Sequence, residues 1–386
     1  MHRYRPAKMR KQKILPIALL LLSVSFLGSC ASGVETPPPP EKLFIPRATP
    51  IETPVPAAPP LTLKVPADFL TIQAAIAASK TGDTILVSPG VYYENLKIGN
   101  KSGLSLRSEM GAESTVIDGS NSSRWTIEVH HSSDINIDGF TVRNSWNQGI
   151  YEFYSKSCVI SSCIITGNRN GGIFLNGGSA RVINNVIARN TTYTGGWFVT
   201  VGIDVVNKCI PFIANNIVVN NTGGAGVRLA STSSDTVMMT NNVIMGNSGW
   251  GIVAFAGHSD TRVLNNIVAS NGEGGIVAPP EYQWGRVPFI SNNDVWANGA
   301  SNYGGILKDL TGTQGNISSD PQLKNPKAGD YHLLPLSPCI DAGTNTGVPS
   351  WLSSDFEGDP RIAYSKGGWH TVDIGADEYV PAESGQ

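Results

Sequence analysis

The sequence is poor in charge and in residues that bind metals or form disulfides. Only 15 % of its 386 residues are Asp, Glu, Lys or Arg, and it has five Cys and six His. A net charge of −2 provides no basic surface for nucleic acid, so we expect no such partner. Low charge with 40 % hydrophobic residues excludes a disordered chain. No zinc-ligand spacing occurs, and we expect no cofactor, with Ca²⁺ as the open alternative.

Asparagine and glycine recur at regular intervals in the middle of the chain. One frame, typified by Ala214-Asn-Asn-Ile-Val-Val-Asn-Asn221, recurs in seven copies that are 22 to 31 residues apart. Its closing residues are Asn144, Asn168, Asn190, Asn221, Asn247, Asn271 and Asn298. A second column, each time followed by Ile or Val, is Gly149, Gly172, Gly202, Gly226, Gly251, Gly275 and Gly305. Such a period with short β-branched runs predicts a parallel β-solenoid.

The repeat also predicts what the asparagines do. Successive coils of a parallel β-solenoid are about 4.8 Å apart, so equivalent residues lie directly over one another. Stacked Asn side chains can then hydrogen-bond to each other and to the turn backbone. We therefore assign the asparagines a structural role and no catalytic one.

The residues before the repeat predict a cap. Residues 67–80 have the pattern of a short amphipathic helix, followed by short strands at 84–87, 95–98, 104–107 and 115–118. The stretches Val65-Pro-Ala-Asp-Phe-Leu-Thr-Ile-Gln-Ala-Ala-Ile76 and Gly82-Asp-Thr-Ile-Leu-Val-Ser-Pro-Gly-Val-Tyr-Tyr-Glu-Asn95 resemble the opening of pectin-lyase-like proteins. The resemblance, over about residues 61–320, implies an all-β fold: a single-stranded right-handed parallel β-helix with an N-terminal capping helix.

The first 60 residues carry an export signal and a spacer. Six basic residues in positions 1–13 precede an apolar run to Leu27, as in a secretory signal peptide of residues 1–29. Leu27-Gly-Ser-Cys30 resembles the lipobox of bacterial lipoproteins, which implies lipidation at Cys30 and a membrane contact through that anchor; ordinary cleavage nearby is the alternative. Residues 30–60 form a Pro-rich linker. We expect an exported, monomeric lipoprotein of the outer membrane or cell surface.

The C-terminal residues 321–386 carry an acidic pattern of their own. They are similar to the C-terminal module of choice-of-anchor surface proteins, which implies an irregular C-terminal cap and tail. Their acids surround Arg361, and we expect turn caps and ion pairs there, with a bound cation as the alternative. These acids are Asp341, Asp355, Asp373 and Glu378.

Charged residues also follow the glycine column. The alternation in Ile203-Asp-Val205 and Val227-Arg-Leu229 predicts that Asp204 and Arg228 point outward on neighbouring coils. Glu128 and Glu152 occupy the same strand of earlier coils, although Tyr151 and Phe153 compete with Glu152 for the interior. If the chain is an enzyme, Glu152, Asp204 and Arg228 are the predicted catalytic residues. The alternative is charge pairing across a solvated sheet.

Aromatic residues gather between the asparagine and glycine columns. Large apolar groups at turns indicate a binding surface, and flat rings stack on sugars. We predict a carbohydrate-binding edge made of Trp146, Tyr193, Trp197, Phe198, Trp250 and Tyr303. A small local core within the longest loop is the alternative.

The functional prediction follows from this edge and from missing motifs. The sequence lacks the catalytic motifs of polygalacturonases, pectin methylesterases and alginate epimerases. We therefore predict a cell-surface protein that binds a polysaccharide or other glycan without turnover. The alternative is an enzyme of the pectin-lyase-like superfamily, namely a polysaccharide lyase.

Overall fold

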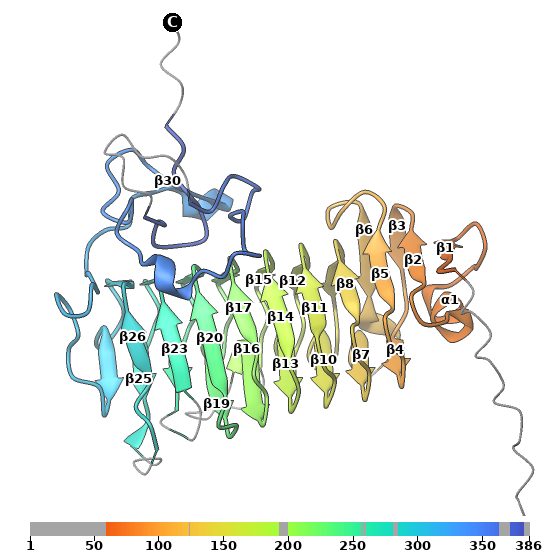
Figure 1. Cartoon of the computed structure of the whole chain (residues 1–386), viewed down its shortest axis with the longest axis horizontal. Helices are drawn as coiled ribbons and strands as arrows, with labels where there is room; N and C mark the ends of the chain where they lie inside the picture. The colour runs from red at the N-terminus through yellow and green to blue at the C-terminus, as the bar shows by residue number, and fades with distance from the viewer. Residues whose placement is uncertain are drawn as a thin grey trace, which may run out of the picture. The chain divides into compact units, whose positions relative to one another are not determined.

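The computed structural model describes residues 59–122, 124–192, 200–255, 257, 260–280, 285–362 and 371–381. These residues form parallel coils that are stacked along one axis, as Figure 1 shows. The predicted signal peptide, Cys30 and nearly all of the linker lie outside them. Within the described residues, no helix has the length and hydropathy needed to cross a membrane.

Each coil contributes one strand to each of three parallel sheets, which we call A, B and C. Sheet A contains β1 (Thr62–Val65), β2 (Thr84–Val87), β5 (Ser105–Ser108), β8 (Asn136–Asp138), β11 (Cys158–Ser161), β14 (Ala180–Ile183), β17 (Phe212–Ala214), β20 (Thr236–Thr240), β23 (Asp260–Leu264) and β26 (Phe289–Ser291). Sheet B contains β3 (Gly90–Tyr92), β6 (Thr115–Asp118), β9 (Thr141–Arg143), β12 (Ile164–Thr166), β15 (Val186–Ala188), β18 (Ile217–Val219), β21 (Val243–Met245), β24 (Ile267–Ala269) and β27 (Asp294–Trp296). Sheet C contains β4 (Leu96–Gly99), β7 (Ile127–His130), β10 (Ile150–Phe153), β13 (Ile173–Asn176), β16 (Thr200–Asn207), β19 (Ala225–Ser231), β22 (Trp250–Ala254), β25 (Gly274–Ala278) and β28 (Tyr303–Gly305).

Stacked aliphatic side chains fill the interior between the three sheets. The period-2 alternation of each strand sends every second side chain inward, and identical positions of successive coils meet there. In sheet C the innermost row is Leu96, Ile127, Ile150, Ile173, Ile203, Val227, Ile252, Ile276 and Tyr303. The apolar row explains how short strands hold a long, continuous core.

The predicted asparagine ladder is present at the corner between sheets B and C. Asn190 Nδ2 donates to Asn221 Oδ1 over 3.0 Å, and Asn221 Nδ2 donates to Asn247 Oδ1 over 2.9 Å. Each amide also donates to a strand carbonyl, so these buried groups have the partners they need. A second ladder, at the corner between sheets A and B, runs through Asn185, Asn216, Asn242, Asn266, Asn293 and Asn316.

Two members of the predicted columns are displaced by the structure. Asn144 has φ of 59° one position before the ladder, and Ser145 donates its backbone N–H to Asn168 Oδ1 in its place. Gly305 does not continue the glycine column, because Tyr303 pairs with Ile276 and so Asn302 aligns with Gly275. The remaining glycines of the column occupy positions where a side chain has no room. A Cβ on Gly226, for example, would lie 2.8 Å from Asn247 Nδ2.

The predicted N-terminal helix is shorter than the pattern indicated. Helix α1 (Ile72–Ala78) begins at Thr71, whose side chain accepts the N–H of Ala74. Its start is delayed because Asp68 accepts the N–H of Lys64 and closes a separate turn there. Its apolar side faces inward, and the helix contacts β1, β2 and β4, which covers this end of the core.

The C-terminal region, which we define as residues 321–381, is irregular as expected. It contains a hairpin of β29 (Leu323–Asn325) and β30 (Asp330–Leu333) and several turns. Its apolar side chains pack on the outward residues of β15, β18, β21 and β24, so it covers a flank of sheet B. The end of the core beyond β28 is instead packed by Leu307 and Leu310.

Candidate functional site

The outer face of sheet C carries most of the side chains that the sequence singled out. Because successive coils pair in register, the outward residues form one continuous row. From β4 to β28 this row is Lys97, Glu128, Tyr151, Phe174, Asp204, Arg228, Val253, Val277 and Gly304. The face therefore changes from charged to aromatic, then back to charged, then to aliphatic along the axis.

Five aromatic residues form a cluster at β10 and β13, which we call the aromatic patch: Trp125, Tyr151, Phe153, Tyr154 and Phe174. The rings of Trp125 and Tyr151 stack with centroids 4.3 Å apart, and those of Tyr151 and Phe174 are 5.5 Å apart. Four of the five are half-buried, and Tyr154 is 49 % exposed. Such a contiguous apolar surface on an outer face is typical of a binding site.

Polar groups border the aromatic patch. Trp125 Nε1 donates to Gln148 Oε1 over 2.8 Å, which fixes the orientation of the indole. The exposed ring of His131 contacts Phe153 and stacks against Tyr154. This arrangement, with fixed rings and hydrogen-bonding groups at their edges, suits a ligand that has both apolar faces and hydroxyls.

Asp204 and Arg228 lie outward on adjacent strands, as predicted. Arg228 Nε donates to Asp204 Oδ1 over 2.7 Å, and its Nη2 donates to Oδ2 over 2.6 Å. Both side chains are largely buried, so this two-point pair is shielded from water. The pair is the cross-strand ion pair that the sequence left as the alternative to catalysis.

Glu152 is not on this face, which corrects its prediction as a catalytic neighbour of Asp204. Its side chain points into the core between Val129 and Leu175 and is 1 % exposed. Oε1 accepts the N–H of Ser155 over 2.6 Å, whereas Oε2 has no hydrogen-bond partner. Burial raises the pKa of this carboxyl to about 7.

The predicted aromatic edge is retained only in part. Trp146 is 50 % exposed at the corner between sheets B and C, and the Arg169 guanidinium lies 3.7 Å from its ring centroid. Tyr303 is 7 % exposed and belongs to the core, so its prediction as a sugar ligand was wrong. Its place in the innermost row follows from its pairing with Ile276. Tyr193, Trp197 and Phe198 lie outside the described residues.

Trp250 provides a second aromatic surface on sheet C. Its ring lies against the backbones of Gly274 and Gly304, where a Cβ would come within 2.3 Å and 2.4 Å of ring atoms. It packs beside Val253 and Val277 and remains partly exposed. Glycines on the next two coils thus let the indole lie flat, which is the orientation for stacking on a sugar ring.

The sequence did not identify Trp125 and Phe174 as site residues. Trp125 precedes its strand and lies outside the repeated frame, so no column marks it. Phe174 follows Ile173 at the position equivalent to Tyr151, and this register was the available signal. The outward direction of Tyr151 and Phe174 was not evident from the sequence, because Glu152, the polar residue of the strand, is the one that faces inward.

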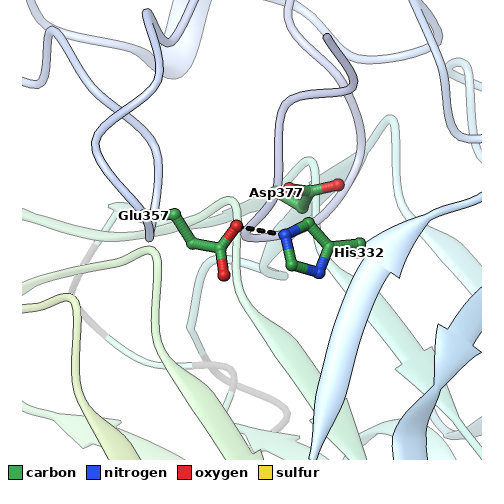
Figure 2. A group of neighbouring side chains, drawn as sticks. All are labelled: His332, Glu357 and Asp377. Atoms are coloured by element: carbon green, nitrogen blue, oxygen red, sulfur yellow. Dashed lines mark ion pairs between the residues drawn. The ribbon is translucent and has the colours of Figure 1, made fainter. Parts of the chain in front are cut away.

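A separate cluster in the C-terminal region has the composition of a metal site. His332, Glu357 and Asp377 each offer a ligand atom, and these atoms lie within 4.8 Å of one another (Figure 2). They line a pocket of about 280 Å³ that also includes Asp330. Both ring nitrogens of His332 already contact carboxylates, Nδ1 with Asp330 and Nε2 with Glu357. Chiefly the Asp330 contact raises the pKa of His332, so a metal ion here would compete with a tightly held proton.

The acids around Arg361 act as turn caps and ion-pair partners. Arg361 Nη2 lies 3.1 Å from Glu378 Oε2, and both side chains are almost fully buried. Asp355 Oδ1 accepts three successive backbone N–H groups, from residues 357 to 359. These contacts match the expected structural role. The Cys residues of the described part are buried free thiols: Cys158, Cys163, Cys209 and Cys339.

Comparisons with known proteins agree with this fold. Residues 125–279 match the family model described as right handed beta helix region. The chain is a right-handed parallel β-helix. Pectate lyase Pel9A has a similar structure, with a TM-score of 0.54 and 18 % identity over 83 % of this chain and 97 % of that one. Among the curated proteins no match was found.

Two further solved structures match with lower scores. Pectin methylesterase PemA from Erwinia chrysanthemi has a TM-score of 0.41 and 15 % identity over 71 % of this chain and 95 % of that chain. Alginate lyase from Paenibacillus sp. str. FPU-7 has a TM-score of 0.37 and 13 % identity over 64 % of this chain and 98 % of that chain. The likeness to Pel9A shows the fold, and the predicted right-handed β-helix is thereby confirmed.

Proposed function

We propose that this protein is a lipoprotein, anchored at Cys30 to the outer membrane or cell surface, that binds polysaccharide on the outer face of sheet C without turning it over. The single observation that carries the proposal is the aromatic patch on β10 and β13. Trp250 adds one more flat ring to the same face of sheet C. Together they form an elongated surface, which suits a linear glycan better than a small molecule.

The energetic argument rests on ring stacking. An aromatic ring against the CH face of a sugar contributes on the order of 1 kcal/mol, so several rings in a row are needed for useful affinity. The patch supplies these rings already ordered by neighbouring contacts, which lowers the entropy lost on binding. The fold it shares with pectate lyase Pel9A, a protein named for its action on pectate, also supports a polysaccharide ligand.

The catalytic alternative receives less support from the predicted residues. A lyase needs a cation or Arg free to meet the sugar carboxylate and a base near the proton that is removed. Arg228 is held by Asp204 through two hydrogen bonds, and Glu152 is enclosed in the core. Neither is placed to act on a chain that lies across the outer face of sheet C.

Binding assays with the full chain in detergent test the proposal. Affinities for a panel of acidic and neutral polysaccharides are measured for the wild type, Trp125→Ala and Tyr151→Ala. Each variant is expected to weaken binding about five-fold, which is the loss of one ring at about 1 kcal/mol. Tyr93→Ala is the control, because Tyr93 is exposed elsewhere on the solenoid.

Turnover is followed in the same samples by the ultraviolet absorbance of unsaturated sugar products, with and without Ca²⁺. We expect none. Product formation by the wild type would establish the lyase alternative, and equal affinities for the wild type and both patch variants would contradict binding on sheet C.

A further inference from the structure

A second pocket lies around the next corner of the coil, on the outer face of sheet A. Its volume is about 540 Å³, and it is lined by hydroxyl, charged and aromatic groups: Asp134, Ser157, Ser179, Arg181, Phe212 and Trp351. Trp351 comes from the C-terminal region, whereas the other five come from the solenoid. The pocket therefore lies where the C-terminal region meets the coils.

Trp351 is fixed in the wall of this pocket by two contacts. The Arg181 guanidinium lies 4.2 Å from its ring centroid, and the Phe212 ring meets it edge-on with centroids 4.8 Å apart. Even so, Trp351 remains 39 % exposed. The pocket thus contains an ordered indole that is still open to a ligand, as in a sugar-binding subsite.

Arg181 differs from the other arginines on the solenoid sheets. Arg107, Arg143, Arg228 and Arg262 each pair with an aspartate within 3.4 Å. Within the described part of the chain, no carboxylate lies within 4.0 Å of the Arg181 guanidinium. The side chain is exposed, and its guanidinium lies over the Trp351 ring. An unpaired guanidinium that is already oriented is a receptor for a carboxylate or sulfate group.

The pocket is adjacent in the chain to the aromatic patch. Strand β10 ends at the patch, and Ser157 of the pocket follows Tyr154 of the patch by three residues. In the next coil, Ser179 follows the last residue of strand β13 by three residues. The patch and the pocket thus flank one corner between sheets C and A, and they share the coils of β10 and β13.

We propose that this pocket binds an anionic sugar residue, with its carboxylate or sulfate group on Arg181 and its ring against Trp351. The hydroxyl and carboxylate groups of Ser157, Ser179 and Asp134 are available to the sugar hydroxyls. The inference rests on the proposed glycan binding and adds to it a preference for acidic chains. It places the charge-selective contact outside the face of sheet C.

Binding of charge-matched ligands to the full chain tests this inference. The probes are polygalacturonate against its methyl-esterified form, and dextran sulfate against dextran, so the two pairs separate carboxylate from sulfate. Arg181→Gln is expected to weaken binding of the acidic member of at least one pair about ten-fold, the effect of losing one charge-assisted contact. Affinity for the neutral member should stay within two-fold.

Arg262→Gln is the matched control, because Arg262 lies in the same outward row of sheet A and is paired with Asp260. It should leave all four affinities unchanged. Trp351→Phe should weaken both members of a pair, since it removes stacking area and no charge. Because Arg181 is exposed, its substitution leaves the core intact, and the unfolding midpoint verifies this.

The outcomes separate the two proposals. Binding that is lost in Tyr151→Ala but unchanged in Arg181→Gln would overturn the anionic subsite and leave binding on sheet C in place. Equal affinity of the wild type for charged and neutral members would also overturn the subsite. Absence of binding to all four probes would overturn both proposals.

Discussion

Replacing Glu152 with Gln should stabilise the protein at neutral pH and leave it nearly unchanged in acid. Burial raises the pKa of the folded-state carboxyl from 4.5 to about 7. The folded state therefore binds the proton more tightly than the unfolded state. The contribution of this carboxyl to the free energy of unfolding is therefore greatest below about pH 4.5. It decreases as the pH rises and becomes constant above about pH 7. A shift of this size corresponds to about 3 kcal/mol of free energy of unfolding.

The glutamine variant removes this titration and keeps the main hydrogen bond. Its side-chain oxygen can still accept the N–H of Ser155, as Glu152 Oε1 does. Urea unfolding at pH 5 and pH 8 would measure the free energy of unfolding of both proteins. We expect the variant to exceed the wild type by about 2–3 kcal/mol at pH 8 and by much less at pH 5.

The comparison between variant and wild type isolates this one group, because the other buried acids titrate equally in both. Glu128→Gln is the matched control, since Glu128 lies on the preceding coil but points outward. This variant removes an outward carboxyl and no buried one, so it should lack the gain at pH 8 that we expect for Glu152→Gln. A Glu152→Gln effect that did not grow between pH 5 and pH 8 would refute the raised pKa of the buried Glu152.

Three further predictions address the ladder, the C-terminal region and the anchor. Asn221→Ala should lower the free energy of unfolding by about 2–4 kcal/mol, because it removes the acceptor of two N–H groups of Asn190 and one donor to Asn247 Oδ1, whereas Asn325→Ala, at an exposed residue with no side-chain cap hydrogen bond, should cost less than 1 kcal/mol; urea unfolding at pH 7 measures both. Arg361→Met should leave the charge of Glu378 buried and unpaired, at a cost of about 3–5 kcal/mol, and should expose the C-terminal region to limited proteolysis while the coils stay resistant; uniform resistance would argue against this. Cys30→Ser should abolish incorporation of labelled fatty acid and release the exported chain from membranes, and unchanged labelling would exclude Cys30 as the lipidated residue.

The repeat explains why the fold could be predicted. Each Asn of the ladder bonds to the equivalent Asn of the next coil, so one short pattern encodes both the local turn and the contact that stacks the coils. The outward placement of Asp204 and Arg228 followed from the alternation of Ile203, Val205, Val227 and Leu229. These predictions depended only on contacts between residues of adjacent coils.

The predictions failed where the alternation was ambiguous or the frame ended. In Ile150-Tyr-Glu-Phe153 two aromatic residues lie outward and the acid lies inward, against the usual ranking of burial. Tyr303 occupies the last coil, where the column slips by three positions and no further coil marks the register.

The sequence by itself determined the coil: the period, the stacking of equivalent residues, the asparagine ladder and the β-branched interior, because each depends on contacts between residues one repeat apart. Only the tertiary structure brought Trp125 onto Tyr151 and Trp351 onto Arg181. Trp125 lies outside the repeated frame, and Trp351 reaches the solenoid through an irregular region 170 residues further along the chain than Arg181. Contacts of that kind have no period, and their geometry depends on how whole surfaces pack.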